Sequence, residues 1–211
     1  LKKEEYKRLF SRLGNIDKLS VREPQGADGI ACYSDRAVKV MPDPTFLVEL
    51  DFWRQMQHKV EGLPKRFILV YSLTGGELVK SVVKEVKGRL NMQVVNISLN
   101  GKANKHCDIN LTRVSINNFL WLFDNATYVI ANSFHSTLFS IHFRKDFCSI
   151  ILESRGSREK NILSTLGLDE VVVSDLESIK NKQTLRLDYS PVVSRIDSIK
   201  SAAMSYLFEN E

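Results

Sequence analysis

Two patterns of apolar residues alternate along most of the chain. The continuous apolar run at residues 67–71 predicts a strand that is covered on both faces of a sheet. Residues 77–90 carry apolar side chains every three or four positions, which predicts an amphipathic helix. The alternation continues, with strands predicted at 93–97, 127–131, 147–152 and 170–173, and helices at 115–123, 132–143 and 158–166. This order predicts an α/β fold built on a Rossmann-like, doubly wound parallel sheet.

The flanking segments are less regular, and residues 100–110 are polar and predicted to form a loop. Helices are predicted at 2–13, 24–32 and 47–57, short strands at 18–22 and 37–41, and a last helix from Pro191 onward. We therefore expect three parts. Residues 1–60 form the tail of an N-terminal Rossmann-like domain and a linker, 61–190 form the C-terminal Rossmann-like domain, and 191–211 form a helix that packs back toward the first part.

Composition narrows the class of protein. With 43% hydrophobic and 26% charged residues the chain has an ordinary globular composition, and its 10 glycines exclude a collagen-like sequence. The net charge of +5 favours an anionic partner, but no basic run of five or more indicates nucleic acid. No apolar run is long enough to span a bilayer, and no leader is evident. The scattered cysteines Cys32, Cys107 and Cys148 predict reduced thiols in a cytoplasmic protein, and the initial Leu1 suggests upstream sequence.

In doubly wound sheets, ligands bind in the loops that follow the carboxyl ends of the strands. The first such loop, residues 72–76, contains Gly75 and Gly76, which would let backbone N–H groups approach a phosphate at a helix start. It matches neither GxxxxGK[ST] nor GxGxxG, so a plain tight turn is the alternative. The third loop, residues 153–158, is basic, and a cation at a helix start suggests a binding role; a solvated surface loop is the alternative.

The second loop, residues 131–135, is the most informative. It leads into a helix whose core face holds Phe134, Leu138 and Ile141. His135 lies about 100° around that helix from Phe134, which allows it to face a cleft. Because a helix start favours anions, His135 could act as a general acid for an acidic substrate. A structural role, as a cap or a core histidine, is the alternative. The run 106–108 contains metal-ligand residue types, but no second cluster completes a metal site.

Five ordered segments resemble the polysaccharide pyruvyl transferase family. They are SVRE at 20–23, DPT at 43–45, the apolar strand at 67–73, NSFHSTLFSI at 132–141, and the RGS segment with the helix that follows it at 155–168. The segment at 132–141 is close to the family's NSFHGTxFSI signature. It departs from that signature at Ser136, where the family usually has glycine, and a side chain there would crowd a ligand or add a hydroxyl contact.

The resemblance implies a fold like the C-terminal domain of a GT-B transferase. It also implies transfer of a pyruvyl group, as a ketal, from phosphoenolpyruvate to a sugar in exopolysaccharide biosynthesis, without a cofactor or a metal. His135 matches the signature histidine and would protonate the enol carbon of the donor. The residues expected to bind the donor are Arg22, Gly75, Gly76, Ser133, Ser136, Arg155, Arg158 and Lys160.

Two alternatives to this function stay open. A nucleotide-sugar glycosyltransferase of GT-B architecture would need an acidic residue for the ribose, for which Glu153 is a candidate, although Arg155 and Arg158 suit phosphoenolpyruvate better. An inactive binding fragment is the other alternative, since the chain matches the family's second half and the isolated chain is expected to be inactive. We expect phosphoenolpyruvate and a saccharide acceptor as partners, with no nucleic acid, and we leave peripheral contact with a membrane open.

Overall fold

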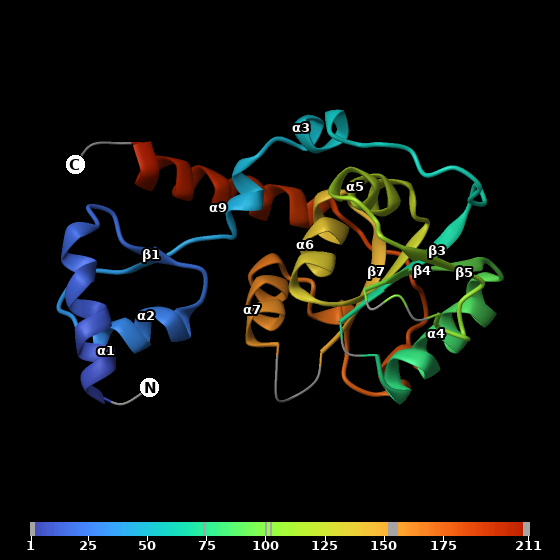
Figure 1. Cartoon of the computed structure of the whole chain (residues 1–211), viewed down its shortest axis with the longest axis horizontal. Helices are drawn as coiled ribbons and strands as arrows, with labels where there is room; N and C mark the ends of the chain where they lie inside the picture. The colour runs from blue at the N-terminus through green and yellow to red at the C-terminus, as the bar shows by residue number, and fades with distance from the viewer. Residues whose placement is uncertain (1–2, 74, 100, 102, 152–155, 209–211) are drawn as a thin grey trace. The chain divides into compact units, whose positions relative to one another are not determined.

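The computed structural model describes residues 3–73, 75–99, 101, 103–151 and 156–208. The chain divides into two compact units (Figure 1). One unit, here called the smaller unit, comprises Leu1–Leu47 and Val193–Glu211, and the other, here called the sheet unit, comprises Val48–Val192.

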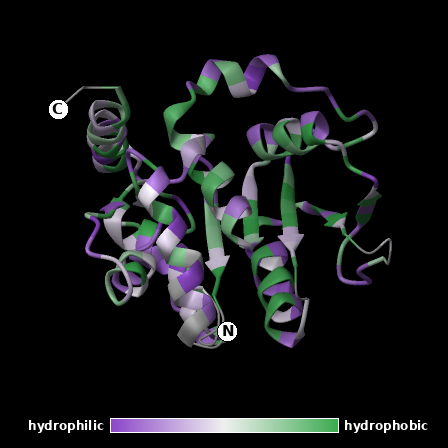
Figure 2. Ribbon diagram, turned by 60° about the vertical axis from the view of Figure 1, so that its left-hand side comes forward, coloured by the Kyte–Doolittle hydropathy of each residue, from purple (hydrophilic) through white to green (hydrophobic). Residues whose placement is uncertain are grey.

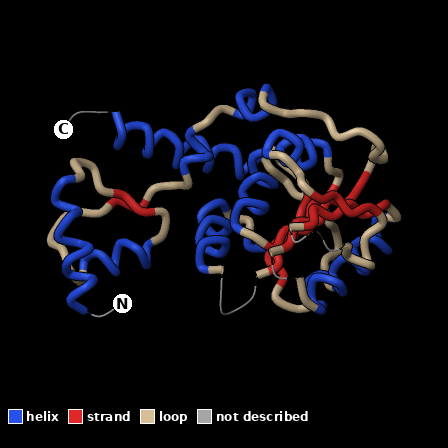
Figure 3. The backbone as a smooth tube through the Cα atoms, in the orientation of Figure 1, coloured by secondary structure: helices blue, strands red, loops and turns tan. Residues whose placement is uncertain are grey.

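The smaller unit combines short helices with a two-stranded parallel ladder (Figure 3). Its elements are α1 (Lys3–Phe10), a 3-10 turn (Ser11–Asn15), β1 (Ser20–Val21), α2 (Pro24–Ala31), β2 (Lys39–Val40), a second 3-10 turn (Pro44–Leu47) and most of α9 (Ser190–Phe208). Pro24 opens α2, where its missing N–H costs no hydrogen bond. The hydroxyl of Tyr206 in α9 donates to the carbonyl of Leu19 at 3.0 Å, which joins α9 to the approach of β1.

The sheet unit is built on a parallel sheet of six strands in the described part of the chain. The strands are β3 (Phe67–Ser72), β4 (Gln93–Ser98), β5 (Ile109–Thr112), β6 (Tyr128–Asn132), β7 (Asp146–Ile150) and β8 (Val172–Val173). Their order is β5-β4-β3-β6-β7-β8, so the chain runs outward from β3 in one direction and then restarts at β6 on its other side. The crevice beside the carboxyl ends of β3 and β6 is the switch point at which such sheets bind ligands.

Helices cover both faces of this sheet (Figure 1). They are α4 (Glu77–Leu90), α5 (Ile116–Asn125), α6 (Phe134–His142), α7 (Ser157–Leu166) and α8 (Leu176–Lys180), preceded by α3 (Leu50–Gln55). Four buried valines of α4 pack on one face together with Ile179 of α8. On the other face, the ring of Tyr71 meets Phe119 of α5 at 5.4 Å between centroids. The central strands are apolar along their length (Figure 2), and the predicted doubly wound α/β fold is confirmed.

Some predicted elements were wrong. The polar stretch 100–110 was expected to be a loop, but its end begins the edge strand β5, whose residues are only partly buried and so lack a continuous apolar run. Of the strand predicted at 170–173, the first two residues belong to a 3-10 turn, Asp169–Val171, and only the last two form a strand, β8. The short helix α8 was not predicted.

In the part of the chain that the structure describes, no helix combines the length and the apolarity that a membrane crossing requires.

Candidate active site

The signature segment lies at the carboxyl end of β6 and the start of α6. Ser133 caps α6, and the residue three positions later, Ser136, completes a reciprocal capping box. The Ser136 N–H donates to Ser133 Oγ at 3.1 Å, and the Ser133 N–H donates to Ser136 Oγ at 3.1 Å. Phe134 and Leu138 are buried as the periodicity predicts, whereas His135 is exposed. The capped turn therefore holds His135 at the surface and not in the core.

The hydroxyl of Ser136 has a different task from the one that the resemblance suggested. It is fully buried, it donates to the carbonyl of Ser133 at 2.8 Å, and it receives the hydroxyl hydrogen of Ser133 at 2.9 Å. This side chain belongs to the helix cap, which argues against its expected contact with a ligand. The Ser133 side chain also belongs to the cap. A ligand at this position is therefore expected to contact the backbone at the start of α6 and not the Ser133 hydroxyl.

Asn132, just before the cap, joins the ends of three strands. Its Nδ2 donates to the carbonyl of Ile150 on β7 at 2.9 Å, and its Oδ1 accepts the hydroxyl of Ser72 on β3 at 3.0 Å. The Gly75 N–H donates in turn to Ser72 Oγ at 3.0 Å. Sequence reasoning gave Asn132 no role of its own, although its place at the head of the signature was a signal. The buried amide fixes the loop after β3 relative to the start of α6.

A cleft of about 610 Å³ opens beside His135 within the sheet unit, and we call it the His135 cleft. Trp53, Tyr71, Phe119 and Phe139 form an aromatic wall of this cleft, beside aliphatic and polar lining residues. The rings of Trp53 and Phe139 meet edge to face, 5.3 Å apart between centroids. The indole N–H of Trp53 is buried and has no hydrogen-bond partner among the described residues. Burial raises the pKa of the Tyr71 phenol. Sequence reasoning missed this aromatic wall, because α3 and α5 contribute to it from distant segments.

Arg158 is the one predicted cation of the sheet unit that a described contact links to the signature segment. Its guanidinium carbon lies 5.2 Å from the centre of the Phe134 ring, and the same ring lies 5.5 Å from that of His135. Arg158 and His135 thus both contact Phe134. Lys160 is exposed, and no described contact of its side chain ties it to this group. The predicted ligand Arg155 and the alternative Glu153 lie outside the described residues.

Gly156, in the RGS segment, has a packing role. Its φ is 136°, and a Cβ there would lie 2.3 Å from Cγ2 of Ile151. Both facts require glycine at this position, because the backbone lies in a region that other residues rarely adopt and the chain approaches closely. The glycine lets α7 begin close to the end of β7.

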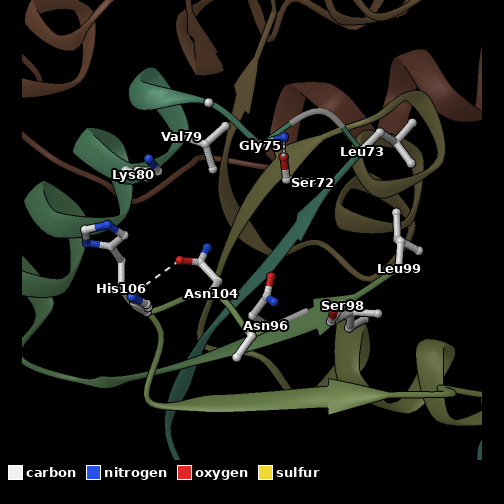
Figure 4. A pocket seen from close by; sticks show the side chains of 14 residues that line it. Ser72, Leu73, Gly75, Val79, Lys80, Asn96, Ser98, Leu99, Asn104 and His106 are labelled. Atoms are coloured by element: carbon white, nitrogen blue, oxygen red, sulfur yellow. Dashed lines mark hydrogen bonds between the residues drawn. The ribbon is translucent and has the colours of Figure 1, made fainter. Parts of the chain in front are cut away.

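Gly75 and Gly76 line a different pocket from His135 (Figure 4). This pocket, here called the glycine-turn pocket, has a volume of about 500 Å³ and lies over the carboxyl ends of β3 and β4. Its lining includes Lys80 and His106. It shares residues 97–99, at the end of β4 and directly after it, with the His135 cleft. The structure therefore places the predicted glycine turn next to the His135 cleft, but not within it.

In the smaller unit, the SVRE and DPT motifs are joined by an ion pair. Arg22 Nη1 lies 2.6 Å from Asp43 Oδ2, with the Asp43 side chain 4% exposed and that of Arg22 42% exposed. Burial alone would raise the pKa of the Asp43 carboxyl, but the hydrogen bonds from Arg22 and Thr45 outweigh it and lower the pKa below its ordinary value. The parallel pairing of β1 with β2 brings the two motifs together. Arg22 thus has a structural partner in addition to its predicted role.

Metal-ligating side chains do not cluster in the described residues, where no group of three or more His, Cys, Asp or Glu residues could hold an ion. A family model for polysaccharide pyruvyl transferase matches residues 1–154. The chain belongs to this family. The match includes the SVRE, DPT and NSFH segments and extends over parts of both compact units. The resemblance drawn from the motifs is therefore confirmed, and the pyruvyl transferase family is a family of transferases.

The fold of this pyruvyl transferase family member is similar to a solved structure titled putative UDP-N-acetylglucosamine 2-epimerase from Listeria monocytogenes. The two share 13% sequence identity with a TM-score of 0.53, over 92% of this chain and 61% of that one. At this identity the likeness concerns the fold alone, and the chain spans less than two thirds of the length of that structure. No curated protein sequence matches the chain.

Proposed function

We propose that this chain forms part of a transferase that moves the pyruvyl group of phosphoenolpyruvate onto a sugar of a polysaccharide or of its precursor. One observation carries the proposal. The signature histidine of the matched family, His135, is exposed at the switch point of the sheet and lines a cleft. A histidine in this position can reach a bound substrate, which a core histidine could not do.

The chemistry requires a proton donor at the donor's double bond. One sugar hydroxyl gives up its proton as its oxygen forms a bond to the carbon that bears the phosphate, while the neighbouring CH₂ carbon takes up a proton and becomes a methyl group. The bond from the central carbon to the phosphate oxygen then breaks, and inorganic phosphate leaves. A second hydroxyl of the sugar bonds to the same carbon and gives up its proton, which completes the ketal. We assign the first protonation to His135, because imidazole can transfer protons near neutral pH.

The donor also needs cations for its carboxylate and phosphate. Arg158 shares the Phe134 ring with His135, and its guanidinium can bind a carboxylate or phosphate through two parallel hydrogen bonds. The start of α6 adds the favourable end of a helix dipole. Arg22, Arg155 and Lys160 are kept as further proposed donor ligands on the strength of the family motifs.

The aromatic wall of the His135 cleft suits a sugar acceptor. Trp53, Tyr71 and Phe119 present ring surface against which the C–H face of a pyranose can pack. A mostly apolar cleft with a few polar groups is the usual form of a small-molecule site. This arrangement would place an acceptor hydroxyl and the donor near the same histidine.

A turnover assay of the complete transferase, of which this chain is proposed to be a part, tests the proposal with phosphoenolpyruvate and a saccharide acceptor, by phosphate release and by the mass of the ketal product. Replacing a general acid typically lowers the rate by about 10²- to 10⁴-fold. We therefore expect His135→Ala to lower kcat by that factor while phosphoenolpyruvate still binds. His58→Ala, at an exposed histidine that lines neither pocket, is the matched control and should retain full activity. Full activity in His135→Ala would remove this residue from the mechanism.

Ligand binding separates the proposed transferase from a nucleotide-sugar glycosyltransferase. We expect phosphoenolpyruvate to raise the melting temperature of the chain. In Arg158→Gln, a concentration of phosphoenolpyruvate at least about ten times higher should be needed for the same rise. Calorimetric titration with UDP should show no comparable binding. Tight binding of UDP with no response to phosphoenolpyruvate would contradict the proposed donor.

A further inference from the structure

The His135 cleft contains one charged side chain that the reaction described above does not use. Arg113 lines this cleft and is exposed, and no hydrogen bond or ion pair joins its side chain to a described residue. Among the described lining residues it is the one with a permanent charge, and none of the others is an aspartate, glutamate, asparagine or glutamine. The cleft therefore offers a cation to a ligand anion, and no carboxylate of the lining competes for it.

The backbone of Arg113 adopts the left-handed conformation, with a φ of 56°. Three described residues other than glycine have a positive φ. Two of them, Asn91 and Arg144, follow the last turns of α4 and α6, where this conformation is common. Arg113 instead lies between β5 and Ser115, the N-cap of α5. A strained residue that no helix end explains is typical of a ligand site.

Hydrogen bonds on both sides hold the backbone of Arg113 in place. Thr112, the residue before it, pairs with the end of β4. On the other side, Ser115 Oγ accepts the N–H of Asn118 at 3.1 Å. Asn118 Nδ2 donates to the carbonyl of His58 at 2.9 Å, which joins the start of α5 to the segment after α3. Arg113 is thus fixed relative to the elements that carry the aromatic wall of the cleft.

Strand order separates Arg113 from the proposed donor site. Arg113 follows β5 at the edge of the sheet (Figure 1), whereas His135 follows β6, three strands away. Neighbouring strands lie about 4.8 Å apart, so these two strand ends are roughly 14 Å apart. Arg158 lies on the far side of β6, in the helix that follows β7. The carboxylate and the phosphate of phosphoenolpyruvate are attached to one carbon, so a donor held by His135 and Arg158 is too short to reach the end of β5.

We propose that Arg113 binds a carboxylate of the acceptor, and that the acceptor is therefore an acidic saccharide that contains a uronic acid. One guanidinium matches one carboxylate through two parallel hydrogen bonds, whereas a phosphate is better held by several cations or backbone N–H groups. The uronic acid would lie at the Arg113 end of the cleft, and the sugar that receives the ketal would lie beside His135. A disaccharide, together with the reach of the arginine side chain, spans this separation. This inference rests on the proposed function and names the chemical class of its acceptor.

The binding of two matched disaccharides tests this inference. Cellobiouronic acid carries a carboxylate at the position where cellobiose carries a hydroxymethyl group. In titrations of the chain followed by NMR, we expect cellobiouronic acid to bind at least about tenfold more tightly than cellobiose. Arg113→Gln should abolish this preference. The control is Arg66→Gln, at an exposed arginine before β3 that lines neither pocket; it removes the same charge and should retain the preference.

A second variant, Arg113→Asn, separates binding from folding. Asparagine adopts the left-handed backbone more readily than arginine, so the melting temperature of this variant should be unchanged or higher. Its preference for cellobiouronic acid should be lost, as in Arg113→Gln. A lowered melting temperature with the preference intact would overturn the inference, because Arg113 would then serve the fold. Equal affinity of the chain for the two disaccharides, or binding of neither, would also overturn it.

Titration with phosphoenolpyruvate distinguishes a carboxylate of the acceptor from that of the donor. We expect Arg113→Gln to leave the affinity for phosphoenolpyruvate unchanged. If this variant weakens phosphoenolpyruvate binding as much as Arg158→Gln does, Arg113 holds the donor, and the inference is overturned while the proposed function stands. Failure of the proposed function would instead appear as absent phosphoenolpyruvate binding with the preference for cellobiouronic acid intact.

Discussion

The capping box of α6 allows a quantitative test of how the signature segment holds His135. The perturbation is the pair of substitutions Ser133→Ala and Ser136→Ala, made singly and together. Each hydroxyl accepts the backbone N–H of the other residue, and the two hydroxyls are also bonded to each other at 2.9 Å. Two reciprocal residues of this kind should not contribute independently to the free energy of unfolding.

The expected magnitudes follow from burial. Ser136→Ala leaves the Ser133 N–H without its partner in a place that water does not reach, which costs about 1–3 kcal/mol. Ser133→Ala removes an N-cap, which costs roughly 0.5–2 kcal/mol. Because both single variants lose the same hydroxyl–hydroxyl bond, the double variant should be less destabilised than the sum by about 1 kcal/mol.

Urea unfolding followed by tryptophan fluorescence measures this, because Trp53 and Trp121 both belong to the sheet unit. The box formed by Asp175 and Ser178 on α8 is the control, since it has the same pattern of bonds at a more exposed position. There Ser178→Ala should cost less than about 1 kcal/mol. Additive losses at Ser133 and Ser136, within about 0.3 kcal/mol, would show that the two side chains do not form the reciprocal box.

Three further predictions concern other parts of the chain. Asp43→Asn should destabilise the smaller unit by about 1–3 kcal/mol, measured by amide hydrogen exchange. Hydrogen bonds from Arg22 lower the pKa of Asp43 in the folded protein. The stabilisation by the ionised Asp43 is therefore complete near neutral pH and is lost as pH falls below about 4. Destabilisation by Asp43→Asn that persists at pH 2 would contradict this reasoning. Gly156→Ala should lower the midpoint of urea unfolding, since its Cβ would meet a side chain at 2.3 Å; an unchanged midpoint would refute the clash. In thiol titration under native conditions, the exposed Cys32 should react quickly, whereas burial raises the pKa of Cys148 to about 12, so that it should react only after unfolding.

Local pattern was sufficient for the elements that are buried along most of their length. The strands β3, β4, β6 and β7 are covered on both faces of the sheet, so the apolar runs in the sequence predict these strands directly. The helix at 77–90 was predicted with its observed bounds because one face of it packs on the sheet. The exposed position of His135 follows from the same short-range rules.

The candidate site could be predicted only in part. The family motifs led to His135 and Arg158, which the structure brings to one phenylalanine ring. They did not reveal Trp53 in the wall of the cleft, or Arg113 among its lining residues. These residues come from segments whose own sequence pattern carries no sign of a ligand.

The family, the alternating elements and the signature histidine could be predicted from the sequence alone, because each depends on residues that are neighbours along the chain. The folded structure was needed to show that Ser136 serves the helix cap, that Arg22 pairs with Asp43, and that the glycine turn belongs to a pocket other than that of His135. For the two pockets, this is because strand order sets which loops lie together. The chain restarts at β6 beside β3, so the loops that share a pocket depend on which strands are neighbours in the sheet. The local periodicity of the sequence does not predict this strand order.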